Sequence, residues 1–334
     1  MKKQFGSRAC AALLCAVVLC LSLTLIACNR KTNAKPLKLG LGVDVAVKAS
    51  DATSDKNGQG QATVTVAAVL VDDAGKIVRA FVDCADSTVD YTAEGKAIAK
   101  EAFATKYEQG EAYGMTTYGG AKQEWYKQAD AFCTLITGKT ADEVKTLVAE
   151  GGKGTPAVID AGCTIYVSEF VRAVEKAVAN ATASDATEKD TVKLGVATTQ
   201  TTKDATEDAA GQNKIESTVF AAAVNADGKI TAAVSDSVEV TFTFDGAGKS
   251  TFDTTKAVAT KSEQGDAYGM VAYGGAKQEW YKQADAFDSA CVGKTTSEIA
   301  ALAGSNGMGN ADLQAAGCTI RVDNFVKAAS KISK

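Results

Sequence analysis

The chain contains one long unit twice, and this repeat limits its fold more than any other feature. The segment AYGMTTYGGAKQEWYKQADAF at residues 112–132 returns as AYGMVAYGGAKQEWYKQADAF at residues 267–287, and the two copies are identical from Tyr118 to Phe132. Flanking matches, PLKLGLGVDV with TVKLGVATTQ and GCTIYVSEFVRAVEKA with GCTIRVDNFVKAASKI, keep the same offset of 155 residues and align Gly40 with Gly195. A unit of this length is a whole domain rather than a solenoid repeat.

The repeat therefore predicts two homologous tandem domains, at residues 37–179 and 192–334, that fold independently. The polar segment NATASDATEKD lies between them, and we assign residues 180–191 to a linker. With 46% hydrophobic residues in the whole chain, each domain has enough apolar material for a core of its own.

The first residues have the pattern of a bacterial lipoprotein signal peptide. Basic residues at the start precede an apolar run that ends in Leu25-Ile26-Ala27-Cys28, which resembles a lipobox. We expect residues 1–27 to be removed, Cys28 to carry acyl chains such as palmitate, and residues 28–36 to form a tether from an extracytoplasmic membrane face, periplasmic or cell-surface. The alternative is an uncleaved apolar anchor.

Charge argues against a nucleic-acid partner. Loss of residues 1–27 removes three basic and no acidic residues, so the formal net charge of −4 becomes −7. The sequence also lacks a basic stripe interleaved with aromatic residues, which nucleic-acid binding would require.

Hydrophobic periodicity in each unit predicts an α+β fold, a small antiparallel sheet packed with helices. Residues 62–71 and 77–83, like 219–224 and 230–236, alternate around a glycine-containing turn as a hairpin does. A first strand at 37–47 is followed by the polar segments 48–61 and, in the second copy, 199–214. A helix is expected from Ala121 to a stop at Gly138, then helices that begin with capping boxes at residues 140–143 and 295–298. Each unit should close with a short strand, CTIYV or CTIRV, and a helix.

Missing residue types limit the chemistry. The chain has no histidine, which removes Ser-His and Cys-His catalytic pairs and most metal-ligand sets, so we predict no metal site. Cys-x-x-Cys is absent from the mature chain, and TGKT and VGKT lack the first glycine of a phosphate-binding loop, so their last threonine is interpreted as a helix N-cap. A hydrolytic enzyme is disfavoured, and a binding or electron-carrier role is favoured over enzymatic activity.

The identical segment has two interpretations. Helical spacing of Trp125, Ala129 and Phe132 indicates a core helix after a structural turn, and local gene conversion would also keep the copies alike. The alternative is a shared binding surface, because glycines and a helix start let backbone N–H groups approach a small anionic ligand. The candidate stacking residues are the aromatic ones of both copies: Tyr113, Tyr118, Trp125, Tyr268, Tyr273 and Trp280.

A second shared element, Ala-Gly-Cys-Thr at residues 161–164 and 316–319, carries a resemblance to a known family. Together with the hairpin turn DAGKI and the last helix VSEFVRAVEKAV, it resembles the FMN-binding domain of bacterial extracytoplasmic flavoproteins. The resemblance implies FMN attached as a phosphoester to Thr164 and Thr319, next to Gly162 and Gly317. The YGM, EWYKQADAF and GKT pieces are similar to repeats in uncharacterised lipoproteins of anaerobic bacteria.

Two functions follow as hypotheses. One is a lipid-anchored binding module in which each domain holds a flavin or small anionic ligand between the YGGAK helix start and the Gly-Cys-Thr turn. If the ligand is a flavin, a redox protein would be its partner. The other is a surface interaction protein that uses the duplicated YGGAKQEWYKQADAF segment bivalently.

Five cysteines remain in the mature chain besides Cys28. In an oxidising compartment we expect disulfides between Cys133 and Cys163 and between Cys291 and Cys318, with Cys84 free.

Overall fold

The computed structural model describes residues 35–332, and residues 36–334 form one compact unit. It has the α+β character expected from the sequence. The predicted signal peptide and the predicted acylation site at Cys28 lie outside the described residues. Among the residues described, no helix is long and apolar enough to cross a membrane.

The first repeat contains three long strands followed by helices. Its elements are β1 (Lys38–Ser50), β2 (Gly58–Val71), β3 (Ile77–Tyr91), β4 (Ala97–Ile98), α2 (Lys106–Gln109), η1 (Gly110–Tyr113), α3 (Trp125–Ile136), α4 (Ala141–Lys145), η2 (Glu150–Gly152), α5 (Pro156–Asp160), α6 (Ser168–Ala179) and β5 (Thr182–Ala183).

The second repeat has the same order of its long strands and main helices, without counterparts of the short strands β4 and β5. Its elements are β6 (Thr191–Lys203), β7 (Gly211–Val224), β8 (Ile230–Phe244), α7 (Lys261–Gln264), η3 (Gly265–Tyr268), α8 (Trp280–Cys291), α9 (Thr296–Ile299), η4 (Ala300–Leu302), α10 (Ala311–Ala315) and α11 (Asp323–Lys331).

Both sheets are antiparallel, with strand orders β4-β3-β2-β1-β5 and β6-β7-β8. The strands are longer than expected. About half of each polar segment, 48–61 and 199–214, which the sequence analysis placed between strands, belongs to the far ends of β1 and β2 and of β6 and β7. Polar residues suit these ends because an antiparallel ladder satisfies the backbone whatever the side chains are.

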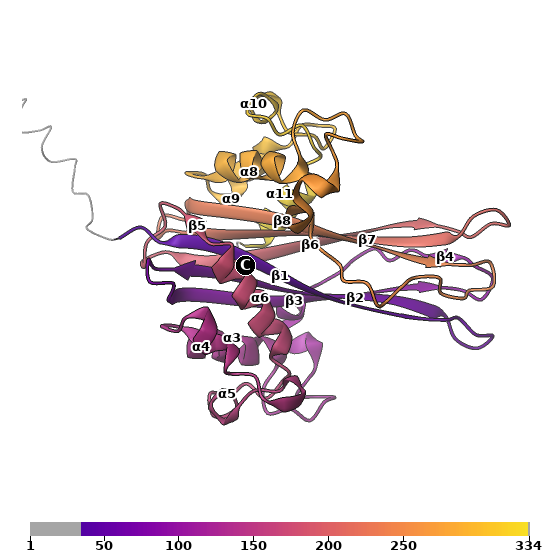
Figure 1. The fold of residues 1–334 in the computed structure, drawn as a ribbon, viewed down its shortest axis with the longest axis horizontal. Coiled ribbons are helices and arrows are strands. Elements are labelled where there is room, and N and C mark those ends of the chain that lie inside the picture. Colours follow the sequence, from indigo (N-terminus) through magenta and orange to yellow (C-terminus); the bar gives the residue numbers. More distant parts are fainter. Residues whose placement is uncertain (1–34, 333–334) are drawn as a thin grey trace, which may run out of the picture. The chain divides into compact units, whose positions relative to one another are not determined.

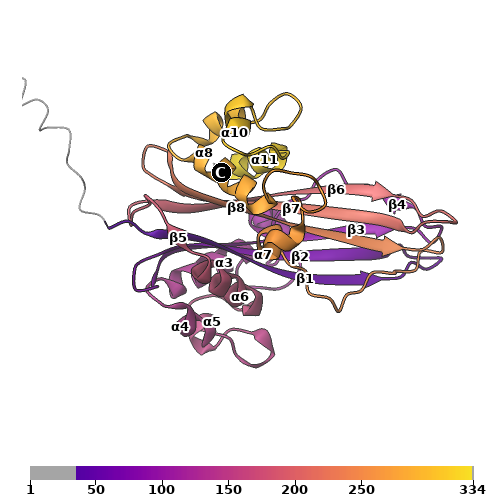
Figure 2. The same ribbon diagram turned by 45° about the horizontal axis from the view of Figure 1, so that its top comes forward.

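The molecule has four layers, with the two sheets face to face and a helical layer outside each (Figure 1), an arrangement that the turned view also shows (Figure 2). β1 lies against β8, β2 against β7 and β3 against β6. One hydrophobic cluster joins the inner faces of both sheets, while two others join each outer face to its own helices.

The shared inner core bears on the predicted domains. The boundaries 37–179 and 192–334 and their independent folding stay predictions. However, a separated repeat would expose the whole inner face of its sheet to water, at a cost that grows with the apolar area exposed.

Reciprocal contacts relate the two repeats by an approximate twofold axis. The N–H of Ala52 donates to the Gly248 carbonyl at 2.8 Å, and the N–H of Ala205 donates to the Gly95 carbonyl at 2.8 Å. Residues that occupy equivalent positions, Tyr91 and Phe244, stack with ring centroids 4.2 Å apart. Each of these contacts made by one repeat is thus matched by an equivalent contact from the other.

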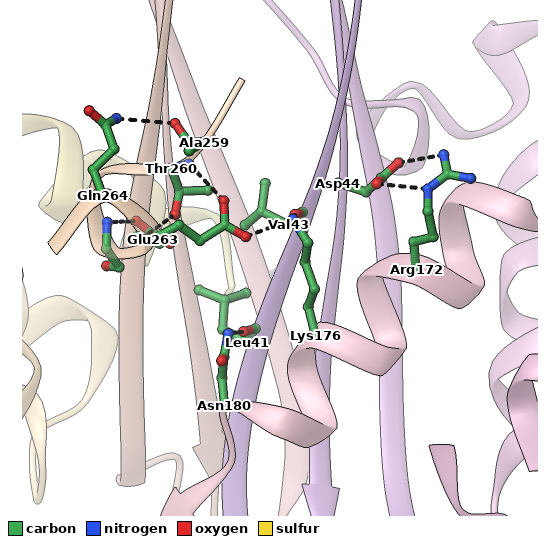
Figure 3. Close-up of polar contacts among 12 residues, drawn as sticks. Leu41, Val43, Asp44, Arg172, Lys176, Asn180, Ala259, Thr260, Glu263 and Gln264 are labelled. Atoms are coloured by element: carbon green, nitrogen blue, oxygen red, sulfur yellow. Dashed lines mark hydrogen bonds and ion pairs between the residues drawn. The ribbon is translucent and has the colours of Figure 1, made fainter. Parts of the chain in front are cut away.

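The helices repeat this reciprocity. Lys176 of α6 reaches Glu263 of the second repeat at 2.6 Å and also donates to the Val43 carbonyl (Figure 3). Its counterpart Lys331 of α11 reaches Glu108 of the first repeat at 2.9 Å. In both cases the acceptor is the glutamate of a capping box, so one carboxylate caps a helix and links the repeats.

Glycines let the last helix of each repeat approach the sheet closely. A Cβ on Gly42 would lie 2.0 Å from the Ala173 carbonyl oxygen, and a Cβ on Gly195 would lie 2.2 Å from that of Ala328. Ala173 and Ala328 are equivalent, so Gly42 has the role of Gly195. The sequence alignment of Gly40 with Gly195 is therefore shifted by two residues, a step that keeps the same strand face.

Most helix predictions are confirmed. α3 begins at Trp125 rather than Ala121, and Gly138 follows its end with φ +85°. Both capping boxes form, with the N–H of Thr140 donating to Glu143 and that of Thr295 to Glu298, each at 2.7 Å. Thr140 is the N-cap expected in place of a phosphate-binding loop.

The prediction that each unit closes with a short strand is wrong. The CTIYV and CTIRV segments make only the isolated bridges Lys153–Tyr166 and Met308–Arg321. Their alternating apolar residues do point inward, as Cys163 and Val167 are buried. The backbone N–H of Thr164 finds a glutamine side chain rather than a neighbouring strand.

Candidate functional site

A buried glutamate explains much of the identical segment. Glu124, directly before α3, is 1% exposed. Its carboxylate accepts hydrogen bonds from the N–H groups of Met115 and Thr116, each at 2.9 Å, and from the Thr116 hydroxyl. The Thr116 hydrogen bonds lower the pKa of Glu124, so the group stays charged. Glu279 holds the second copy in the same way through the N–H groups of Met270 and Val271.

The start of α3 is therefore not a free anion site. The carboxylate of Glu124 stands at the N-cap position and fixes the preceding turn. A second anion there would be repelled by this carboxylate. An anionic ligand at the YGGAK helix start stays a prediction, and it would have to bind close to the Glu124 carboxylate.

A buried glutamine connects α3 to the Gly-Cys-Thr turn. The side-chain amide of Gln128 donates to the Gln123 carbonyl at 2.9 Å, and its oxygen accepts from the N–H and the hydroxyl of Thr164 at 2.8 and 3.0 Å. Gln283 and Thr319 make the same pair of contacts at 2.8 and 2.9 Å. Gly162 and Gly317 stand beside these threonines with φ of +103° and +105°. Both shared motifs thus hold each other in place.

Two aromatic residues of the identical segment face water. Tyr118 is 88% and Tyr273 91% exposed. Each ring lies over a glycine, since a Cβ on Gly114 or Gly269 would lie within 2.6 Å of the Tyr118 or Tyr273 ring. The structure brings neither tyrosine to the other predicted stacking residues.

A buried lysine unites the remaining predicted aromatic residues. Lys261, with a side chain 7% exposed, places its Nζ 5.3 Å from the centroid of the Tyr268 ring and 5.5 Å from that of Trp280. In the first repeat, Lys106 has the same position over Tyr113 and Trp125, at 5.5 and 5.9 Å. Cations over aromatic faces are stabilised by the ring quadrupole.

Carboxylates complete the lysine's surroundings, differently in each repeat. Lys261 pairs with Glu216 at 2.6 Å and lies 3.9 Å from Glu239. Lys106 has Asp86 at 3.7 Å, and Thr63 occupies the position of Glu216. Burial is the largest single influence and would lower the pKa of Lys261, but Glu216 and Tyr268 together outweigh it, so the pKa is raised. The lysine is therefore charged at neutral pH.

A cavity of about 390 Å³ lies at this lysine in the second repeat, within the size range of small-molecule sites. It is lined by Thr199, Glu216, Thr218, Lys261, Tyr268, Met270, Trp280, Ile320, Arg321, Asp323, Asn324 and Phe325. Of the residues predicted from sequence, Tyr268 and Trp280 line it, and the residues directly after Thr319 do as well. Thr319 itself is not among them.

Sequence reasoning missed the lysine, although a signal was present. The segments ATKYEQG at 104–110 and ATKSEQG at 259–265 keep the lysine inside a Thr-x-x-Glu capping box in both copies. Glu216 and Arg321 have no counterpart of like charge in the first repeat, where Thr63 and Tyr166 stand. A search for residues identical in both copies could not find Glu216 and Arg321, because they occur in the second copy alone.

The Gly-Cys-Thr turns do not fit a flavin phosphoester. The hydroxyls of Thr164 and Thr319 already donate to glutamine oxygens. The cations of the nearby cavity are also neutralised, because Arg321 pairs with Asp323 at 2.8 Å and Lys261 with Glu216. A phosphate that joins the flavin to the threonine would still carry one negative charge, which these carboxylates would repel. Flavin binding of another kind stays a prediction.

The described cysteines are all free thiols: Cys84, Cys133, Cys163, Cys291 and Cys318. Burial raises the pKa of Cys163 and of Cys318 to about 11, so both are protonated and unreactive at neutral pH. The two predicted disulfides stay predictions for the oxidised protein. Within residues 35–332, no cluster of three or more acidic or cysteine side chains suited to a metal ion is found.

Comparison with known proteins gives one partial similarity. Part of the chain is 32% identical over 126 residues to a chlorophenol reductase of Desulfitobacterium hafniense, a match that covers 34% of this chain and 38% of the relative. The chain thus spans well under half of that relative's length. No protein-family model matches the chain. No solved structure matches it either.

Proposed function

We propose that the protein is a lipid-anchored extracytoplasmic binding module whose second repeat binds a small aromatic molecule that carries a hydroxyl or similar polar group. The observation that carries this proposal is the cavity at Lys261, where two aromatic rings and a charged lysine meet. Aromatic ligands gain from ring contacts, and a buried charged group fixes a polar substituent.

The chemistry of the lining supports this ligand class. Tyr268, Trp280 and Phe325 offer ring faces or edges, and Met270 offers a polarizable sulfur. Lys261 can donate a hydrogen bond to a hydroxyl oxygen, while Glu216 can accept a hydrogen bond from the same hydroxyl. Because lysine and glutamate neutralise each other, the site suits a neutral polar group better than a phosphate or carboxylate.

The partial similarity to a chlorophenol reductase agrees with a phenol as the ligand. It also keeps the electron-carrier idea open, in which a flavin held without a covalent bond would occupy the same aromatic cavity. The residues of the cavity bind and orient the ligand in this proposal, and none is assigned a catalytic step.

The two tryptophans make the test selective. They occupy equivalent positions, Trp125 in the first repeat and Trp280 in the second, and the chain has no others. In Trp125→Phe, 4-chlorophenol should quench the remaining fluorescence of Trp280 with saturation. In Trp280→Phe, the fluorescence of Trp125 should not respond beyond collisional quenching.

Equal saturable quenching in both variants would contradict a site restricted to the second repeat. No saturable quenching in wild type or Trp125→Phe would contradict the ligand class. If the purified protein absorbs at the flavin bands and denaturation releases the chromophore, a flavin rather than a phenol is the ligand of this cavity.

The bivalent surface function remains the second candidate, since Tyr118 and Tyr273 are both almost fully exposed on turns fixed by buried glutamates. Tyr118→Ala or Tyr273→Ala alone should weaken cosedimentation with cell envelopes modestly, and the double variant should weaken it far more. Equal binding by wild type and double variant would exclude this surface. Lipid anchoring at Cys28 is tested separately, by incorporation of a palmitate analogue that Cys28→Ala abolishes.

A further inference from the structure

A larger cavity of about 820 Å³ lies where the two repeats meet, between β1 and β5 of the first sheet and β8 of the second, beside α7 and α8. Its lining combines an apolar wall from both sheets with hydroxyl and carboxylate groups from the second repeat. The residues are Leu39, Leu41, Val43, Asn180, Thr182, Ala183, Ser184, Asp185, Thr231, Ala232, Ala233, Val234, Ser235, Asp236, Ser262, Glu263, Tyr281, Asp285, Asp288, Ser289 and Val292. It is distinct from the cavity at Lys261.

In the first repeat, an aromatic side chain fills the equivalent space. The ring of Tyr107 lies 4.8 Å from that of Phe81 and 5.7 Å, edge-on, from that of Tyr126. Its hydroxyl donates to Asp130 at 3.2 Å. The first repeat thus keeps this region closed with a cluster of three rings.

The second repeat opens the same region. The positions of Tyr107 and Phe81 are taken by Ser262 and Val234, while the tyrosine and aspartate are kept as Tyr281 and Asp285. All four of these residues line the cavity. Removal of two large rings therefore accounts for the space, and it leaves Asp285 without the tyrosine hydroxyl that its counterpart accepts.

A further pair of substitutions makes the floor polar. Val82 and Cys133 of the first repeat become Ser235 and Asp288. The Asp288 carboxylate, 6% exposed, accepts from the N–H and the hydroxyl of Ser235, both at 2.8 Å. A buried carboxylate is costly unless it is paired, so this exchange of a thiol for an acid needs a compensating role.

Backbone groups at the edges of this cavity are already satisfied. Lys176 and Asn180 donate to the carbonyls of Val43 and Leu41 on β1 (Figure 3), and Asp288 accepts the Ser235 N–H of β8. An added peptide strand would have to displace these side chains. The cavity therefore suits a small molecule rather than an extended peptide.

The charge of the lining selects the kind of molecule. Five carboxylates line it, and none of the described residues in the lining is Lys or Arg. Lys176, which reaches in from α6, pairs with Glu263 alone. The remaining carboxylates lie beside the apolar wall of Leu39, Leu41 and Val292 and near the ring of Tyr281, a combination that matches an ammonium group on a carbon chain.

We propose that this cavity is a second binding site, for a small aliphatic primary amine. The ammonium group lies between Asp285 and Asp288, with Tyr281 beside it, and the carbon chain lies along Leu39, Leu41 and Val292. Ser262 lets the ligand enter, because the tyrosine of the first repeat would occupy this place. Burial and the neighbouring Asp285 raise the pKa of Asp288 to about 7, and a bound cation would lower it again.

Calorimetric titration with 1,5-diaminopentane tests the proposal, with 1,5-pentanediol as the uncharged ligand of equal length. The diamine should bind the wild type and the diol should not. Ser262→Tyr, which restores the side chain of the first repeat, should abolish binding. Asp285→Asn, at an exposed position and so without risk to the fold, should weaken binding about tenfold by loss of one charged contact.

The reciprocal change provides the matched control. Tyr107→Ser removes one of the two rings that close the first repeat but leaves Phe81, and Val82 and Cys133 in place of the Ser235–Asp288 pair, so it should not create a second amine site. Equal binding of diol and diamine, unchanged binding in both Ser262→Tyr and Asp285→Asn, or displacement of the diamine by millimolar Mg²⁺ would each overturn the proposal. These results do not depend on the phenol site, which Trp280→Phe tests separately.

Discussion

The two repeats are most alike in the buried hydrogen bonds that fix their turns, and they differ most in the residues around the two cavities. Glu124 and Glu279 fix the same turn, and Gln128 and Gln283 fix the same Gly-Cys-Thr threonine. In contrast, some residues of both cavities differ between the copies, as Thr63 and Glu216 or Tyr107 and Ser262 show. The candidate sites thus combine shared residues, such as Lys261 and Trp280, with residues found in the second repeat alone.

The difference also gives the repeats unequal roles. The first repeat closes its polar region with Tyr107 and Phe81. The second repeat exchanges these rings for smaller residues and gains acidic side chains at Asp288, which is buried, and at Glu216, whose side chain is 27% exposed. A duplicated fold can accept such costly groups in one copy because the other copy, through the shared core, still contributes its stability.

Separating the repeats tests how far they depend on each other and should have the largest effect. Fragments 36–190 and 191–334 each lose half of the shared core, so each should self-associate or lack a cooperative melting transition, and mixing them should restore one. Light scattering after size exclusion, with calorimetric melts, measures this. A monomeric fragment with a sharp transition of its own would support independent domains instead.

The shared scaffold should respond equally in both copies. Gln128→Leu or Gln283→Leu leaves a threonine N–H and a backbone carbonyl without their partner, which should lower the free energy of unfolding by roughly 2–4 kcal/mol. Urea denaturation of both variants provides the comparison. A loss confined to one copy would show that the glutamines do not have a common structural role.

The buried acid of the second repeat should make stability depend on pH. Burial raises the pKa of Asp288 to about 7 from 3.8 in the unfolded chain. Between these values the folded state holds a proton that the unfolded state has released, so stability should fall as pH rises from about 4 to about 7 and level off above.

The slope for one such group reaches at most about 1.4 kcal/mol per pH unit. Burial also raises the pKa of Asp83 to about 7, so the first repeat contributes a similar slope. Asp288→Asn, which stays neutral, should remove only the contribution of Asp288, because burial also raises the pKa of Asp236 in the same repeat. Urea midpoints at pH 5, 6, 7 and 8 measure the slopes, and an identical slope in the variant would disprove the assignment.

The smallest effect is expected at the Gly-Cys-Thr turns. Thr164→Val and Thr319→Val each remove one hydroxyl hydrogen bond, while the glutamine oxygen keeps the backbone N–H, so each should cost about 1 kcal/mol. When the protein is made with a flavin transferase and flavin present, wild type, Thr164→Val and Thr319→Val should have the same flavin absorbance, because these hydroxyls carry no flavin. Loss of colour in either variant, with folding retained, would restore the covalent flavin attachment implied by the family resemblance.

Much of the fold was accessible from sequence because it depends on local patterns. The hairpins, the capping boxes at Thr140 and Thr295 and the last helices follow from turn residues and periodicity. The packing of one sheet on the other was not accessible. β2 and β7 are apolar on both faces toward their buried ends, and a sequence with this pattern does not show whether helices or another sheet cover each face.

The candidate site was only partly predictable for a related reason. Tyr268 and Trp280 were identified as aromatic residues near a turn, but Lys261 and Glu216 come from segments far apart in the chain. A charged pair of this kind has no periodic signature, and the fold alone brings it to the rings.

The stoichiometry of 4-chlorophenol binding tests most directly the claim that a common scaffold carries a ligand site in the second repeat alone. Calorimetric titration of the wild type should give one molecule per chain, because Glu216 and Arg321 have no charged counterparts at Thr63 and Tyr166. Two molecules per chain, bound with similar affinity, would contradict this account and show that both copies keep the same site.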